Sequence, residues 1–194
     1  MRGRKILRIS YGRKTRFVNK EYGSAKLKGI FGDGFDYEAV RSKRVELMDN
    51  YVEKNGIEVK SGAKELLSFL KENGYKVALA TATPPERAER YLKAHDLYKY
   101  FDVTVSASMV SVGKPAPDIY LKAAEMLSLS PQSCVALEDS PNGIKSASSA
   151  GCVTVMVPDL DKPSNDIIPL LHGVADGLSD VKRILRELED CNIQ

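Results

Sequence analysis

The stretch VALEDSPNGI, residues 135–144, joins a short apolar run to two adjacent acids, Glu138 and Asp139. Together with the preceding Cys134, the run has the length and composition of a buried strand. Ser140 and Pro141 follow, and this pair is typical of a helix start, with serine as the cap and proline in the first turn. A strand that passes directly into a helix predicts one unit of a parallel α/β sheet.

The same alternation extends in both directions from residue 61 onward. Further strands are predicted at residues 77–80, 101–105 and 153–157, and helices at 61–74, from 83, at 118–127 and from about 179. Ser61 and Thr83 are the expected caps of the first two of these helices. Single helices between strands imply parallel pairing with helices on both faces, so the predicted fold is an α/β, Rossmann-like, doubly wound parallel sheet.

Residues 1–58 have a different character. Asp36 to Asn55 is predicted as a strongly charged helix, and nothing there requires a parallel strand. We therefore expect two parts, a small helical module over 1–58 and an α/β core over 59–194.

Composition sets the general class. The 194 residues are 43% hydrophobic and 28% charged, which is typical of a globular protein. The sequence contains no apolar run of membrane-spanning length and no signal-peptide core, so a cytoplasmic protein is expected, with its three cysteines reduced. Residues 1–20 contain eight basic residues and no acid, and this basic arm could contact nucleic acid. A solvated terminus is the favoured interpretation, because a basic run alone is weak evidence.

Three positions at the predicted strand ends could share one site. Thr81, Lys114 and the pair Glu138 and Asp139 offer a hydroxyl, an ammonium and two carboxylates. Ligands of open parallel sheets bind outside the carboxyl ends of the strands. This set suits a phosphoryl group and Mg²⁺, although each residue alone could be a helix cap or a solvated charge.

Three phrases carry a resemblance to a known family. VALATAT (77–83), GKPAPDIYLKAA (113–124) and ALEDSPNGIKSASSAG (136–151) resemble the haloacid-dehalogenase (HAD) superfamily, in its branch of β-phosphoglucomutase-like phosphatases. The resemblance implies that Thr81 and the backbone of Ala82 hold phosphoryl oxygens and that Lys114 neutralises charge. It also implies that Asp139, helped by Glu138, holds Mg²⁺. Residues 1–58 would then contain part of the family's helical cap.

The family's nucleophile is an aspartate in the pattern Asp-x-Asp-Gly on the first core strand, and this pattern does not occur in the chain. We therefore expect a core that lacks this strand, between the strands ending at Thr81 and Glu138. Asp33 and Asp36, in KGIFGDGFD (28–36), resemble the pattern only superficially and are expected in a turn. Residues 6–9 could form a strand, but Arg8 would be costly in the middle of a sheet covered on both faces.

Three explanations of the missing aspartate stay open. They are a start codon placed too late, which we favour, a natural short form, and a strand supplied by another chain. The leading functional expectation is a Mg²⁺-dependent phosphatase or phosphosugar mutase acting on a small phosphorylated metabolite such as a sugar phosphate. The alternative is a protein that binds a phosphate ligand without turnover. No membrane contact is expected, and the oligomeric state is left open.

Overall fold

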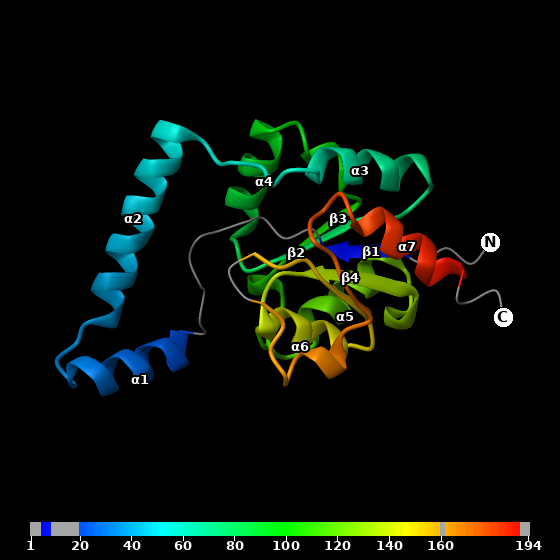
Figure 1. Ribbon diagram of the computed structural model, residues 1–194. Helices are drawn as coiled ribbons and strands as arrows, with labels where there is room; N and C mark the ends of the chain where they lie inside the picture. Colours follow the sequence, from blue (N-terminus) through cyan, green and yellow to red (C-terminus); the bar gives the residue numbers. More distant parts are fainter. Residues whose placement is uncertain (1–4, 9–19, 160–161, 191–194) are drawn as a thin grey trace. The chain divides into compact units, whose positions relative to one another are not determined.

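The computed structural model describes residues 5–8, 20–159 and 162–190 (Figure 1). The chain divides into two compact units. The α/β core contains residues 1–12 together with 59–194, and the helical module contains residues 13–58. The described strand of this segment, Lys5–Arg8, falls in the core unit, and the division into residues 1–58 and 59–194 stays a prediction.

Parallel strands form the centre of the core. Strand β1 (Lys5–Arg8) pairs with β4 (Cys134–Glu138), β4 with β5 (Val153–Met156), and β5 with the two-residue strand β6 (Gly173–Val174). Strands β2 (Ala78–Thr81) and β3 (Val103–Ser106) form a second parallel pair, and β2 lies beside β1. Thr81 and Glu138 are the last residues of their strands, where ligands of parallel sheets bind.

Strand β1 occupies the place that the sequence analysis expected to be vacant. Lys5 is level with Cys134 and Arg8 with Ala136, so β1 is a parallel neighbour of β4. The side chain of Arg8 lies outside the described side chains, so its cost in the sheet stays a prediction. The core therefore has its strand between β2 and β4, but that strand carries no acidic residue.

Of the three hydrophobic clusters among the described residues, the two larger ones meet at β4, one on each face of the sheet. One cluster joins β4 residues Val135 and Leu137 to α3 (Ala63–Glu72), α4 (Pro85–Ala94) and α7 (Val181–Asp190). The other joins Cys134 and Ala136 to α5 (Asp118–Leu127) and α6 (Pro141–Ser149). Alternate residues of a strand point to opposite faces, so both faces of β4 are buried. The predicted α/β fold with a parallel sheet and flanking helices is confirmed.

Two of the three expected helix caps differ from the prediction. Ser140 caps α6 as predicted, since its Oγ accepts a hydrogen bond from the N–H of Gly143 at 3.2 Å. The cap of α3 is Gly62 at φ 79°, one residue after Ser61, where a Cβ would lie 2.6 Å from the Ser179 Oγ. The cap of α4 is Pro84, one residue after Thr83. The sequence located these helices correctly, but their caps lie one residue later.

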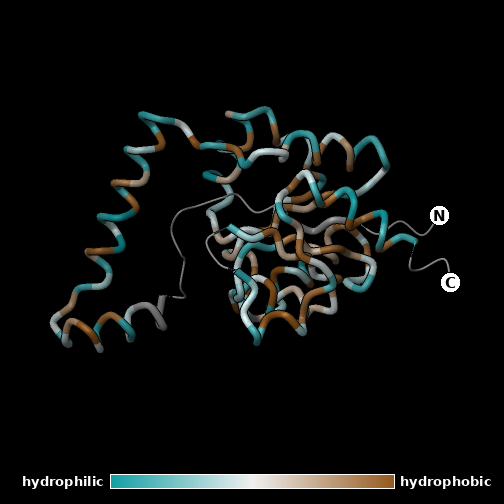
Figure 2. Tube along the Cα trace, viewed as in Figure 1, coloured by the Kyte–Doolittle hydropathy of each residue, from teal (hydrophilic) through white to brown (hydrophobic). Residues whose placement is uncertain are grey.

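The helical module consists of α1 (Lys20–Phe31), which was not predicted, and α2 (Tyr37–Asn55), which was. Gly32 at φ 90° begins the turn between them, and the rings of Phe31 and Phe35 stack with centroids 5.2 Å apart. Figure 2 shows hydrophobic residues recurring among hydrophilic ones along α2, which has no buried residue. Among the described residues of the chain, no helix combines the length and the apolar character needed to cross a membrane.

Candidate functional site

A buried carboxylate at the end of β4 is the centre of the candidate site. The side chain of Glu138 is fully buried, and its Oε1 lies 2.6 Å from the Nζ of Lys114. The hydroxyl of Tyr120, which is also fully buried, donates a hydrogen bond to the same oxygen. The Lys114 Nζ also lies 3.3 Å from this hydroxyl, so the three groups form one connected cluster. A charge this deeply buried is tolerated only when such partners surround it.

Local structure holds Lys114 at this position. The residue lies in the segment before α5, and the Oδ1 of Asp118, the first residue of α5, accepts a hydrogen bond from the N–H of Val112 at 3.2 Å. On the other side of Lys114, the Ser146 hydroxyl of α6 donates to the carbonyl oxygen of Ala116 at 2.6 Å. Both neighbouring helices therefore anchor the segment that carries the lysine.

The first turn of α6 closes over the same carboxylate. A Cβ added to Gly143 would lie 1.9 Å from the Oε2 of Glu138, far inside van der Waals contact. Ser140, the cap of this helix, has its Oγ 3.4 Å from the same oxygen. Glu138 thus lies between the Lys114 and Tyr120 side chains and the helix backbone, and only glycine fits at residue 143.

Thr81 lies at the end of β2, level with Ser106 of β3. Its Oγ1 accepts a hydrogen bond from the N–H of Thr83 at 3.1 Å, and the carbonyl oxygen of Thr83 accepts one from the Ser106 hydroxyl at 2.9 Å. These two bonds fix the turn between β2 and α4, in which Ala82 is exposed. Because Oγ1 acts as an acceptor in the turn, its own proton can be donated to a ligand oxygen.

Asp139 follows β4 directly and is partly exposed, unlike Glu138. In the described part of the chain, no group of three or more histidine, cysteine or acidic residues could hold a metal ion. Mg²⁺ does not require such a group, because it commonly binds one or two carboxylates and completes its shell with water and phosphate oxygens. A partly exposed aspartate at a strand end therefore fits Mg²⁺, whereas one oxygen of Glu138 already has two donors.

Of the residues expected in the site, the structure brings Lys114 and Glu138 into contact and places Thr81, Ala82 and Asp139 at or just after strand ends. Tyr120 and Gly143 were not among the predicted site residues. Tyr120 lies next to Ile119 in α5, a helix for which only residues that pack in the core were predicted. Gly143 did carry a signal, since a glycine inside a helix weakens it and requires a packing reason.

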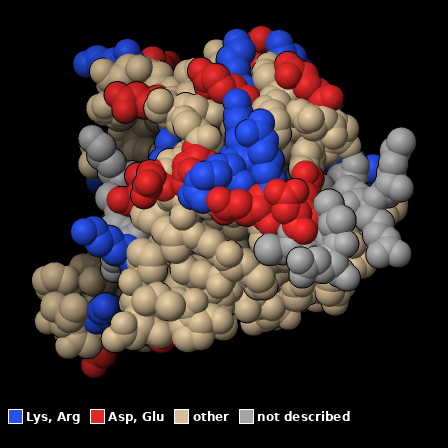
Figure 3. Space-filling model, turned by 45° about the vertical axis from the view of Figure 1, so that its right-hand side comes forward, with Lys and Arg blue, Asp and Glu red and all other residues tan. Residues whose placement is uncertain are grey.

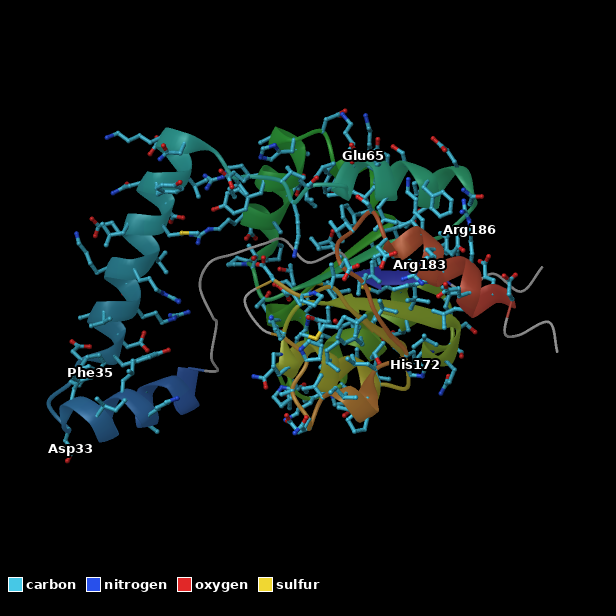
Figure 4. The ribbon with its side chains drawn as sticks, viewed as in Figure 1. Asp33, Phe35, Glu65, His172, Arg183 and Arg186 are labelled. Carbon is cyan, nitrogen blue, oxygen red and sulfur yellow. The ribbon has the colours of Figure 1, made fainter. Side chains whose placement is uncertain are left out.

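The two aspartates considered as substitutes for the nucleophile lie in the helical module. Asp33 is in the turn between α1 and α2, and Figure 4 shows its side chain pointing away from both helices. Asp36 caps α2, since its Oδ1 accepts a hydrogen bond from the N–H of Ala39 at 2.9 Å. Both residues therefore lie in the turn that the sequence predicted, and Asp36 has a capping role there.

The basic arm of residues 1–20 falls outside the described side chains. On the face of the molecule drawn in Figure 3, basic and acidic side chains lie next to one another and do not form a field of one sign. Helix α7 gives an example, because Arg183 pairs with Asp180 at 2.9 Å and with Glu187 at 2.7 Å. Nucleic-acid binding stays a prediction with no support from this face.

The comparisons with known proteins agree with the fold and the motifs. The haloacid dehalogenase-like hydrolase family matches residues 9–151, and the chain belongs to this family. A phosphorylated carbohydrates phosphatase from Thermotoga maritima is 40% identical over 124 residues, which are 64% of this chain and 50% of that protein. Hexitol phosphatase B from Escherichia coli is 39% identical over 97 residues, which are 50% of this chain and 44% of that protein.

A solved structure has a similar fold. The crystal structure of CbbY from Rhodobacter sphaeroides in complex with phosphate has a TM-score of 0.65 and 26% identity, covering 76% of this chain and 67% of that one. The relatives and structural neighbours of the present chain are β-phosphoglucomutase-like HAD phosphatases, as the sequence motifs indicated. The chain spans about half the length of the curated relatives that it matches.

Proposed function

We propose that this chain is a Mg²⁺-dependent phosphatase or phosphosugar mutase of the HAD type, acting on a small phosphorylated carbohydrate. The observation that carries the proposal is the Lys114–Glu138–Tyr120 cluster at the carboxyl end of β4. The buried carboxylate holds the lysine ammonium in a fixed position, where it can neutralise a phosphoryl group. The similarity to a phosphorylated carbohydrates phosphatase and to a hexitol phosphatase supports a sugar phosphate as the ligand.

Each residue of the predicted site has a proposed role. The hydroxyl of Thr81 and the N–H of Ala82 would donate hydrogen bonds to phosphoryl oxygens, and Lys114 would offset their charge. Asp139 would be a carboxylate ligand of Mg²⁺, with Glu138 holding Lys114 beside it. When bound, Mg²⁺ would supply a positive charge next to the phosphoryl oxygens. Residues 13–58 would be the partial cap, and 59–194 together with β1 the core.

The absence of an acid on β1 favours a second candidate function. The family's nucleophile is expected on this strand, and the sequence has no acidic residue before Glu21. The alternative is therefore a protein that binds the phosphorylated ligand without turning it over. If the chain is instead a shortened form of an active enzyme, an upstream strand with Asp-x-Asp-Gly would have to replace Lys5–Arg8 beside β4.

The test is to measure Mg²⁺-dependent phosphate release from p-nitrophenyl phosphate and from a hexose monophosphate. Calorimetric binding of the hexose monophosphate is measured on the same samples. Asp139→Asn and Lys114→Ala are compared with Lys122→Ala, which removes an exposed lysine of α5. Circular dichroism checks that each variant is folded.

Each outcome decides between the candidates. Phosphate release that both site variants lose, and Lys122→Ala keeps, supports the enzyme. Mg²⁺-dependent binding without release, lost in the same two variants, supports the ligand-binding protein. Neither release nor binding would refute both candidates.

A further inference from the structure

Buried polar side chains are few in the described part of the chain, and most of them gather around the candidate site. Apart from tyrosine and cysteine, the buried residues with polar or charged side chains are Ser106, Glu138, Ser146 and Thr154. Glu138 belongs to the site itself. A buried hydroxyl costs free energy unless it is hydrogen-bonded, and alanine would fill almost the same space as serine. Packing alone therefore does not explain the two buried serines.

Ser106 holds the turn that follows β2. It is the last residue of β3 and lies level with Thr81, and its hydroxyl donates to the carbonyl oxygen of Thr83 at 2.9 Å. The N–H and the hydroxyl of Ser108 both donate to the Ser106 Oγ, at 3.4 and 3.2 Å. A hydroxyl has two lone pairs and one proton, so the proton of Ser106 is left for the Thr83 carbonyl. The turn of residues 81–83 is thereby tied to the neighbouring strand.

Ser146 makes the corresponding bond to the segment of Lys114. Residues 113–116 form a turn in which the N–H of Ala116 donates to the carbonyl oxygen of Gly113 at 3.1 Å. The Ser146 hydroxyl donates to the carbonyl oxygen of Ala116 at 2.6 Å. A serine inside a helix often bonds to the backbone of its own helix, one turn earlier, whereas this serine reaches a residue 30 positions away. The turn that carries Lys114 is thereby tied to α6.

Thr154 makes the same kind of bond away from these turns. Its hydroxyl is also fully buried and donates to the carbonyl oxygen of Leu170. Leu170 belongs to the segment before β6, and that segment carries no residue of the candidate site. Thr154 therefore provides a matched comparison for the two serines.

Both serines hold carbonyl groups close to residues with a proposed ligand contact. Thr83 directly follows Ala82. Ala116 stands two residues after Lys114. Hydrogen bonds to a phosphoryl oxygen need donor–acceptor distances of about 2.7–3.2 Å, and the groups of a binding site must be held to within roughly 0.5 Å. Bonds from β3 and α6 to the two turns meet this requirement.

We propose that Ser106 and Ser146 are positioning residues of the phosphate site. Ser106 fixes the Thr81 hydroxyl and the Ala82 N–H, and Ser146 fixes the Lys114 ammonium, so that groups from two separate turns meet one phosphoryl group. Neither serine contacts the ligand, because each acts through the turn whose carbonyl it holds. The inference rests on the proposed function, since it assumes that this site binds a phosphoryl group.

The experiment is calorimetric titration of the full chain with inorganic phosphate in the presence of Mg²⁺, together with urea unfolding of the same samples. Ser106→Ala and Ser146→Ala should each raise the Kd for phosphate about tenfold, the lower end of what residues that orient the ligands of metal sites contribute. Thr154→Val has nearly the same shape and removes an equivalent buried hydroxyl. It should lower the free energy of unfolding as the serine variants do, but leave the Kd unchanged.

The amide resonance of Ala82 in a nitrogen-15 NMR spectrum shows whether Ser106 acts through its own turn. Saturating phosphate should shift this resonance in the unchanged chain. The shift should be smaller in Ser106→Ala and the same in Ser146→Ala, which acts on Lys114. A shift that Ser106→Ala leaves unaltered would refute its assignment to the turn of residues 81–83.

The possible outcomes separate this inference from the proposed function. Serine variants that bind phosphate as tightly as the unchanged chain would refute the inference alone. An equal rise in Kd in Thr154→Val would also refute it, because the effect would then follow from lost stability. An unchanged chain that binds no phosphate would overturn the inference and the proposed function together. If circular dichroism shows that an alanine variant is unfolded, cysteine at the same position, whose thiol is a weaker donor, takes its place in each measurement.

Discussion

Replacing Gly143 with alanine should destabilise the core strongly, although alanine normally stabilises a helix. The added Cβ would lie 1.9 Å from the Glu138 Oε2 and 2.0 Å from its Cδ, whereas ordinary contact begins near 3.4 Å. The carboxylate must therefore move by about 1.5 Å, which is enough to break its 2.6 Å contact with Lys114. Breaking a buried pair costs about 3–5 kcal/mol, and the helix gains up to about 1 kcal/mol from alanine, so we expect a net loss of about 2–4 kcal/mol.

Urea unfolding followed by circular dichroism measures this loss. For a chain of this size, a change of about 3 kcal/mol also lowers the midpoint of thermal unfolding by roughly 6–12 °C. The matched control is Gly29→Ala in α1, where a Cβ meets nothing within 4 Å. The same substitution there should be neutral, or stabilising by up to about 1 kcal/mol.

A double-variant cycle isolates the cause. In a Glu138→Ala background the carboxylate is absent, so Gly143→Ala should no longer destabilise the protein and should stabilise it by up to about 1 kcal/mol. A cost that is the same in both backgrounds would show that the clash lies elsewhere. A cost below about 0.5 kcal/mol in the unchanged background would refute the reasoning altogether.

Three further predictions follow from individual contacts. Tyr120→Phe removes one donor from the buried Glu138 and should lower the free energy of unfolding by about 1.5–3 kcal/mol in urea unfolding, whereas Tyr98→Phe, at an exposed position, should have no effect. Ser140→Ala removes the cap of α6 and should cost about 1 kcal/mol by the same measurement, and recovery with Ser140→Asp would confirm a capping role. Burial raises the pKa of Cys134 to about 11 and that of Cys152, with a smaller effect of the neighbouring Cys134, to about 12, both from an ordinary value of 9.0. Above about pH 9 the folded state keeps thiol protons that the unfolded state loses, so the free energy of unfolding should fall as the pH rises towards 11 and 12. The double variant Cys134→Ala and Cys152→Ala should lack this fall. The same pH slope in the double variant and in the unchanged chain would contradict the prediction.

The strand and helix order of the core could be predicted because each element carries a local signal. The helix predicted at residues 118–127 has those bounds in the structure, and the strand predicted at 134–137 extends one residue further, to Glu138. A strand at residues 6–9 was considered possible, but the pairing of β1 (Lys5–Arg8) with β4 was not predicted. The four residues of β1, KILR, include two basic side chains, and pairing with β4 is a contact between segments more than 120 residues apart. Long-range pairing of this kind overrides local propensity.

The site residues also differ in whether a local sequence signal marks them. Lys114 and Glu138 could be found because they stand in recognisable phrases, and the structure brings them together. Tyr120 could not be found, since a tyrosine in a helix stripe is usually a packing residue, and only the folded chain shows that its hydroxyl meets the carboxylate. The one-residue displacement of the α3 and α4 caps has a local cause in backbone geometry, namely the positive φ of Gly62 and the extended backbone of Pro84.

The adjacent acids Glu138 and Asp139 have different surroundings although they are neighbours in sequence. Glu138 is the last residue of β4 and fully buried, so it needs the partners that Lys114 and Tyr120 supply. Asp139 is past the strand and partly exposed, so its carboxylate can meet a ligand without a comparable desolvation cost. Two adjacent carboxylates at a strand end therefore need not act as a pair of metal ligands. In this chain the first is suited to fixing a lysine, and this arrangement requires a glycine at residue 143, because any larger residue would occupy the space of the carboxylate.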